Sequence, residues 1–146
     1  IILDGKKVAN EIAEDLKKRC EILNKKGIIP KLVIFTNDDD ASKVYVRNKV
    51  KRCEEIGIKV ITYPIKKFSD FENIQKGYDF SDVPYILQEP SNLTHFQRDV
   101  FVDMFPSTDA DGFSATNTGK LFKNEEKDGL TCFKACTPKG IITLLD

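Results

Sequence analysis

Hydrophobic residues recur along the chain with spacings that predict alternating helices and strands. Near the start, Val8, Ile12 and Leu16 are separated by polar and charged residues, and the apolar pattern continues to residue 23. Positions three or four apart share one stripe of a helix. The pattern therefore predicts an amphipathic helix over about residues 6–26, ended by Gly27.

Two short apolar runs predict parallel strands joined by a second helix. Residues 31–36 read KLVIFT, which is typical of a strand buried on both faces. A helix should begin at residue 41 or 42, after acidic residues that favour its positive end, and should end at Ile56 before Gly57. Residues 58–63 predict the second strand, so the three elements form a βαβ unit.

The remaining elements are less regular. We expect a short helix over residues 68–80 and a third strand over 84–87 that ends at Gln88. A helix over 93–104 should be capped by Thr94 or Asn92 and stopped by Pro106, and a polar loop should follow over 107–120. A last helix, over 137–146, should start with Thr137 as N-cap and Pro138. Together the elements predict an α/β fold, a three-layer α/β/α arrangement around a small, mostly parallel sheet.

Length and charge limit the functions to consider. The 146 residues suffice for one domain, and the 23 basic residues balance the 23 acidic ones. We therefore expect no nucleic-acid or membrane partner, and a small molecule or a protein instead. No stretch approaches the roughly 20 apolar residues of a membrane span, and the first residues lack a signal-peptide layout, which predicts a cytoplasmic protein.

The cysteines predict neither a disulfide framework nor a metal centre. Cys20, Cys53, Cys132 and Cys136 are scattered through a chain that is large enough to form a core, which favours reduced thiols. The single histidine, His95, is far from them in sequence. A zinc site would therefore need an unusual ligand set.

Tyr45 and Lys49 are the first candidates for chemistry. They are four residues apart on the second predicted helix, beside the stripe that should bury Val46 and Val50. Ligands of open α/β sheets bind near the carboxyl ends of the strands, where a partly desolvated amine can exchange protons. The alternative is a surface helix with a solvated lysine. Short-chain dehydrogenases share this spacing but carry a glycine-rich turn that is missing before Tyr45.

Gln88 and Asp111 are further candidates. The Gln88 amide follows the third strand directly and should project into the same crevice, although it could also be an ordinary loop residue. The run 109–112, Asp-Ala-Asp-Gly, is typical of an Asx turn, and a carboxylate held there could grip the amidine-like edge of a pterin. Gly119-Lys120 lacks the hydroxyl residue of a phosphate loop and is interpreted as a turn.

Four segments in order resemble those of a known family. They are Leu3-Asp4-Gly5-Lys6-x-Val8-Ala9, the run from Asp38-Asp39-x-Ala41-Ser42 through Tyr45-Val46-x-x-Lys49 to Cys53-Glu54-x-x-Gly57-Ile58, Asp109-x-Asp111-Gly112-Phe113 with Asn117-x-Gly119-x-Leu121, and Cys136-Thr137-Pro138-Lys139-Gly140-Ile141. The pattern is similar to the methylenetetrahydrofolate dehydrogenase/cyclohydrolase family, over nearly the whole chain.

The resemblance implies a folate site in one-carbon metabolism. The residue matching Lys49 would assist proton movement and orient water, Tyr45 would pack on the folate rings, Gln88 would position the lysine, and Asp111 would hold the pterin. The reactions implied are the NADP-linked oxidation of 5,10-methylenetetrahydrofolate and the hydrolysis of the methenyl product to 10-formyltetrahydrofolate. Residues 1–146 would be the catalytic domain, like the N-terminal domain of amino-acid dehydrogenases, with a linker helix starting at 137–146.

The resemblance also implies what lies outside the chain. The final helix stops within an apolar run and the glycine-rich Rossmann segment is absent, so we expect the NADP-binding domain to follow in a longer polypeptide and this chain alone not to transfer hydride. The full-length protein would be a homodimer and the isolated piece a monomer.

Several residues depart from the family pattern. Asn37 and Asp40 replace the usual glycine and proline, and Leu87-Gln88-Glu89-Pro90-Ser91-Asn92 replaces Val-Gln-Leu-Pro-Leu-Pro. Glu89 could pair with Lys49 and hold it protonated. Two alternatives therefore stay open: a non-catalytic folate-binding or interaction module, and an unrelated α/β scaffold.

Overall fold

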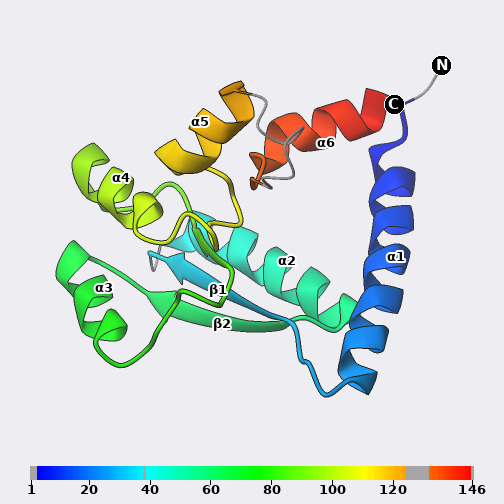
Figure 1. Cartoon of the computed structure of the whole chain (residues 1–146), viewed down its shortest axis with the longest axis horizontal. Helices are drawn as coiled ribbons and strands as arrows, with labels where there is room; N and C mark the ends of the chain where they lie inside the picture. Colours follow the sequence, from blue (N-terminus) through cyan, green and yellow to red (C-terminus); the bar gives the residue numbers. More distant parts are fainter. Residues whose placement is uncertain (1–2, 38, 124–131, 146) are drawn as a thin grey trace.

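The computed structural model shows helices alternating with strands, as Figure 1 displays. It describes residues 3–37, 39–123 and 132–145. The elements in chain order are α1 (Gly5–Lys25), β1 (Lys31–Thr36), α2 (Asp40–Ile56), β2 (Lys59–Pro64), α3 (Phe68–Gln75), β3 (Tyr85–Leu87), α4 (His95–Asp103), α5 (Ala115–Lys123) and α6 (Cys136–Leu145).

The sheet is parallel throughout its described strands. Its order is β2-β1-β3, so the apolar run 31–36 forms the central strand, and Phe35 pairs with Tyr63 on one side and Leu87 on the other. Val33, Ile34 and Phe35 of β1 are all buried. This confirms the strand that the KLVIFT run predicts, because side chains packed against both faces of the sheet hide its apolar residues from solvent.

Helices cover both faces of the sheet. Phe35 and its neighbours on one face pack against Phe71 of α3 and Phe101 of α4, and their rings meet mostly edge to face. Ile34 on the other face packs against Val46 and the half-buried Val50 of α2. The predicted three-layer α/β/α arrangement is confirmed, with α3 and α4 packed on one face of the sheet and α2 on the other.

Local capping fixes the ends of α2. The Asp39 carboxylate accepts a hydrogen bond from Ser42 N at 2.8 Å and another from Ser42 Oγ at 2.9 Å. At the other end, Gly57 adopts φ +91°, and its N–H bonds back to the last turn. An acidic cap and a left-handed glycine are strong boundary signals, so the predicted helix is correct to within two residues.

The predicted loop over residues 107–120 is wrong at both ends. Residues 108–110 run parallel beside β3, because Tyr85 N donates to Thr108 O and Ala110 N donates to Tyr85 O. From Ala115 the chain forms α5, so Gly119 lies in a helix and not in a turn. The polar residues that suggest a loop are buried here: Ser114 accepts from Asn117 N at the start of α5, and Asp109 accepts from Ser114 N.

The last helix also begins earlier than predicted. Lys139 N donates to Ala135 O at 3.1 Å, which draws Cys136 into the first turn, so Thr137 is not the N-cap. None of the side chains that the structure describes in α6 is buried. Its residues Lys139, Gly140 and Leu144 face α1 across an apolar groove of about 300 Å³, which Cys136 also lines.

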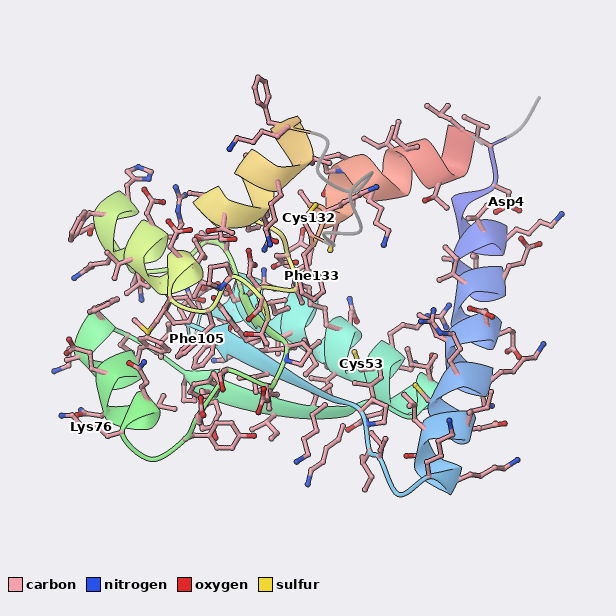
Figure 2. The ribbon with its side chains drawn as sticks, viewed as in Figure 1. Asp4, Cys53, Lys76, Phe105, Cys132 and Phe133 are labelled. Carbon is pink, nitrogen blue, oxygen red and sulfur yellow. The ribbon has the colours of Figure 1, made fainter. Side chains whose placement is uncertain are left out.

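The cysteines are neither paired with one another nor grouped into a metal site among the residues described. All four thiols are free. Cys20 of α1 is buried and lies near Cys53 of α2, which Figure 2 labels. Among the described residues, no cluster of histidine, cysteine and acidic side chains could hold a metal ion. No helix in residues 3–37, 39–123 or 132–145 has the length and apolar character needed to span a bilayer.

Candidate active site

Parallel pairing brings Gln88 and Asp111 to the same edge of the sheet. Gln88 follows β3 and extends its ladder by one bond, from its own N to Phe35 O at 2.8 Å. Asp111 follows the segment 108–110, which runs parallel to β3. Carboxyl ends of parallel strands share one edge, which is where open α/β sheets bind ligands. Two residues 23 positions apart therefore become neighbours in one crevice.

A buried carboxylate shapes the turn that carries Asp111. Asp109 is 2% exposed and accepts hydrogen bonds from Gly112 N at 3.1 Å, Ser114 N at 2.8 Å and Asn117 Nδ2 at 3.2 Å. The turn is present, but it differs from the predicted Asx turn, which uses the N–H two residues on: Asp109 binds N–H groups three and five residues on, those of Gly112 and Ser114. Because Asp109 holds the turn, Asp111 is left to face the pocket.

Gly112 lets the segment before α6 approach this turn. Its φ is +70°, and a Cβ built on it would lie 2.6 Å from the carbonyl oxygen of Phe133. Phe133 N in turn donates to Asn117 Oδ1 at 3.2 Å, which ties the two segments together (Figure 2 labels Phe133). This contact places the first turn of α6, and with it Cys136, over Asp111.

The resulting pocket has a volume of about 330 Å³ and joins the predicted residues from three parts of the chain. It is lined by Lys49, Leu87, Gln88, Glu89, Asp111, Phe113, Ala135, Cys136, Thr137 and Pro138. Lys49, Gln88 and Asp111 thus converge, as the sequence predicts. Tyr45 lies one helical turn before Lys49, but its side chain is 62% exposed and is not part of the lining.

The Gln88 side chain offers an unused acceptor. Its Nε2 donates to the carbonyl oxygen of Glu89 at 2.6 Å, and the residue is only 7% exposed. Its Oε1 is buried and has no hydrogen-bond partner among the described residues. A buried carbonyl oxygen without a donor carries a desolvation cost of about 1–3 kcal/mol. The site therefore favours a lysine or ligand N–H at this point.

The electrostatics centre on Asp111. Burial raises the pKa of the Asp111 carboxyl, and the positive charge of Lys49 opposes this rise. Burial is also the first cause that raises the pKa of the Cys136 thiol, and the Asp111 carboxylate adds to it. A carboxylate partly removed from water, with a cation nearby, is suited to bind a planar ligand edge that offers two donors.

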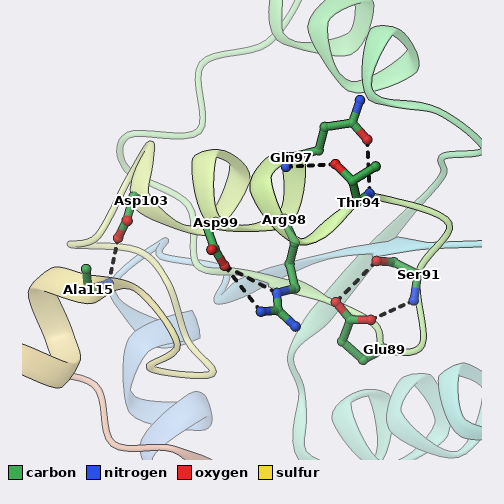
Figure 3. Close-up of polar contacts among 8 residues, drawn as sticks. All are labelled: Glu89, Ser91, Thr94, Gln97, Arg98, Asp99, Asp103 and Ala115. Carbon is green, nitrogen blue, oxygen red and sulfur yellow. Dashed lines mark hydrogen bonds and ion pairs between the residues drawn. The ribbon is translucent and has the colours of Figure 1, made fainter.

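Glu89 does not pair with Lys49, which corrects the pairing considered from the sequence. Its carboxylate accepts hydrogen bonds from Ser91 N at 2.6 Å and from Ser91 Oγ at 3.2 Å (Figure 3). No ion pair between Glu89 and Lys49 occurs in the described part of the chain. The local turn satisfies Glu89, so its charge is directed to the loop although the residue lines the pocket.

Sequence reasoning missed two residues of this region. Cys136 enters the lining because it starts α6, and its only advance signal was its place in the motif before Pro138. Asn37 fixes the turn after Gln88 through a hydrogen bond from its Nδ2 to Pro90 O at 2.8 Å. No local pattern could indicate that bond, because it joins residues 53 positions apart.

A nicotinamide dinucleotide does not fit the turn between β1 and α2. Such a cofactor needs a glycine-rich turn whose backbone N–H groups meet the pyrophosphate. Between β1 and α2 the chain has Asn37 and acidic residues, and the Asp39 carboxylate already accepts from Ser42 N in the first turn of the helix. This region would repel a pyrophosphate, whereas the pocket at Lys49 suits a small planar ligand.

Comparisons with known proteins agree on one family. Residues 3–77, about half of the chain, match the family model described as tetrahydrofolate dehydrogenase/cyclohydrolase, catalytic domain. The bifunctional protein FolD of Francisella philomiragia is 40% identical over 151 residues, and FolD 1 of Lactobacillus johnsonii is 36% identical over 152 residues. Each alignment covers 99% of this chain and 52% of the relative, so the chain spans about half the length of these proteins.

Solved structures give the same result. The crystal structure of the bifunctional enzyme FolD, methylenetetrahydrofolate dehydrogenase/cyclohydrolase, from Campylobacter jejuni superposes with a TM-score of 0.83 at 32% identity, over 99% of this chain and 52% of that one. A 5,10-methylenetetrahydrofolate dehydrogenase from the silkworm Bombyx mori superposes with a TM-score of 0.79 at 29% identity, over 99% and 50%.

Proposed function

Because this chain belongs to the tetrahydrofolate dehydrogenase/cyclohydrolase family, we propose that it supplies the folate site and the catalytic lysine of a bifunctional enzyme of one-carbon metabolism. The enzyme would oxidise 5,10-methylenetetrahydrofolate with NADP and then hydrolyse 5,10-methenyltetrahydrofolate to the 10-formyl compound. The observation that carries this proposal is the convergence of Lys49, Gln88 and Asp111 on one pocket.

Each group has a role that its surroundings support. Asp111 would accept two hydrogen bonds from the amidine-like edge of the pterin. Lys49 would hold or move a proton beside the one-carbon bridge, and the unpartnered Gln88 Oε1 would accept a hydrogen bond from the Lys49 amine. Tyr45, exposed one turn away, would stack on the part of the folate that extends beyond the pocket.

The hydrolytic step needs no cofactor. Water adds to the methenyl carbon, the bond from that carbon to N5 breaks, and one proton is released. A basic group beside the attacking water and an acceptor that orients it are what Lys49 and Gln88 would provide. The oxidation step transfers a hydride to NADP, which another domain of the full-length protein would hold, since the turn between β1 and α2 does not suit its pyrophosphate.

Hydrolysis of 5,10-methenyltetrahydrofolate by the protein at its natural length tests the proposal. Lys49→Ala should lower kcat by roughly 10²- to 10⁴-fold, the usual contribution of a positioned proton-transfer group. Lys51→Ala, which removes an exposed lysine from the same helix, should leave kcat unchanged. If the wild-type protein has no hydrolase activity, or if both variants behave alike, the proposed function is wrong.

Glu89→Leu separates this proposal from a non-catalytic module. If Glu89 inhibited the site by binding Lys49, its removal would create or raise activity. We expect no gain, because the Glu89 carboxylate is bound to Ser91. An inactive wild type that gains hydrolysis in Glu89→Leu would instead support the non-catalytic alternative.

A further inference from the structure

We propose that Asn37 is a positioning residue that orients the Gln88 amide by fixing the turn after β3. The inference rests on the proposed function, because it concerns the group that faces Lys49. Asn37 itself is not part of the pocket lining. It lies at the end of β1, next to the strand from which Gln88 projects, and is only 6% exposed.

Two hydrogen bonds hold the turn, one before and one after the Glu89 carbonyl. Gln88 N donates to Phe35 O at 2.8 Å, which fixes the start of the turn to the sheet. Two residues later, the Pro90 carbonyl accepts from Asn37 Nδ2 at 2.8 Å. The Glu89 carbonyl, which receives the Gln88 Nε2 hydrogen bond, lies between these two anchors. Its direction therefore depends on both of them.

That carbonyl determines how the Gln88 amide faces the pocket. With Nε2 committed to Glu89 O, the opposite atom, Oε1, is left as the acceptor. If the carbonyl turned away, the amide could rotate and present N–H donors to the Lys49 amine. A donor facing an ammonium is repulsive, whereas an acceptor stabilises it. By fixing the turn, the Asn37 hydrogen bond favours the orientation in which Gln88 Oε1, and not Nε2, faces the Lys49 amine.

The position of Asn37 makes it a specific anchor. Asn37 directly follows β1, the strand that pairs with β3, and its Nδ2 donates to the Pro90 carbonyl, which lies beyond the last paired residues of these strands. Glu89, through Ser91, closes the same turn locally. A glycine at position 37 would have no side chain to make the bond to Pro90 O. In this chain a polar clamp therefore orients the turn.

A double-mutant cycle on the natural-length protein tests the inference. Asn37→Ala should lower kcat for 5,10-methenyltetrahydrofolate hydrolysis by roughly 10- to 100-fold, with a smaller change in KM, since displacement of a catalytic group by about 1 Å has effects of that size. In a Gln88→Ala background the same substitution should change kcat less than about twofold, because no amide remains to orient.

Thr108→Val is the matched structural control. It also removes a buried side-chain donor to backbone carbonyls, here the Thr108 hydroxyl that donates to Phe80 O at 3.1 Å and to Phe105 O at 3.2 Å, but Thr108 does not line the pocket. It should lower the free energy of unfolding to a similar extent and leave kcat unchanged. An Asn37→Ala effect that is equal in both backgrounds, or one that Thr108→Val reproduces, would overturn the positioning role.

A second measurement keeps the inference independent of activity. The side-chain NH₂ resonances of Gln88, assigned by their loss in Gln88→Ala, should exchange slowly with water in the wild type and faster in Asn37→Ala. Unchanged exchange contradicts the inference whether or not the enzyme is active. Absence of hydrolysis in the wild type, with the predicted change in exchange, contradicts only the proposed function.

Discussion

Cys136 Sγ donates a hydrogen bond to Asp111 Oδ1 at 3.5 Å, which joins the first turn of α6 to the turn after the segment 108–110. The two residues are 25 positions apart, and both line the pocket that contains Lys49. This contact makes the Asp111 carboxylate sensitive to the position of α6.

The buried charge of Asp111 should reduce stability at neutral pH. Because burial raises its pKa in the folded state, the folded protein binds a proton more readily than the unfolded chain. The destabilisation is therefore complete above the folded pKa and disappears as the pH falls below the unfolded value. Asp111→Asn should raise the free energy of unfolding at pH 7 and lose this advantage in acid, as measured by urea unfolding across pH.

The same variant should weaken folate binding and hydrolysis, because an amide replaces one of the two acceptor oxygens by an NH₂ donor, which faces a donor of the ligand edge. Asp82→Asn, at an exposed aspartate in another part of the chain, controls for the loss of one negative charge. A variant that binds folate normally would exclude Asp111 from the ligand site.

Alkylation of Cys136 should report on its neighbour. Burial and then the Asp111 carboxylate raise the pKa of this thiol, so only a small fraction is thiolate at neutral pH. Asp111→Asn should speed its reaction with iodoacetamide, followed for each cysteine by mass spectrometry. Cys53 is the internal control, because burial raises its pKa as well but Asp111 is not among the causes. Equal acceleration at both thiols would indicate general loosening instead.

Gly112→Ala should destabilise the fold by about 2–4 kcal/mol, since it combines an unfavourable φ with a contact that the backbone must move to relieve. The new Cβ would lie 2.6 Å from Phe133 O. Gly119→Ala is the matched control: it lies in α5 with no atom within 4 Å of its added Cβ and should gain about 1 kcal/mol from helix propensity. Thermal unfolding of both variants gives the comparison.

Asp109 and Asp103 both accept hydrogen bonds near the start of α5, but they should contribute differently to the free energy of unfolding. Asp109→Ala removes a buried carboxylate that accepts from Gly112 N, Ser114 N and Asn117 Nδ2, and should lower the free energy of unfolding by about 3 kcal/mol. Asp103→Ala removes an exposed carboxylate that accepts from Ala115 N at 2.6 Å and should lower it by about 1 kcal/mol (Figure 3). Similar losses in urea unfolding would contradict the anchoring role of Asp109.

The fold was predictable where local signals agree with tertiary structure. The run 31–36 is entirely apolar or β-branched after its first residue, and α2 has both an acidic cap and a terminal glycine, so each element was identified within two residues. The convergence of Lys49, Gln88 and Asp111 also followed, because parallel strands place their carboxyl ends together.

The sequence could not predict features that depend on distant partners. The helix α5 is anchored by Asp109, and the Asn117 amide that supports it reaches back to Pro106 O at 2.8 Å. These contacts convert a polar, loop-like composition into a capped helix. The charges of Glu89 and Lys49 predict a pair, but Ser91, two residues after Glu89, donates to its carboxylate instead. Which donor binds the Glu89 carboxylate depends on the conformation of the turn, and the spacing of residues in the sequence does not give that conformation.

The wide separation of the pocket residues along the chain has a consequence for folding. Lys49, Gln88, Asp111 and Cys136 belong to four different segments, and no two neighbours in sequence order are closer than 23 positions. Long loops must close before any two of these groups meet. Ligand recognition should therefore emerge late and in a single step during folding, and a bound folate would protect the whole assembly against unfolding and not one loop of it.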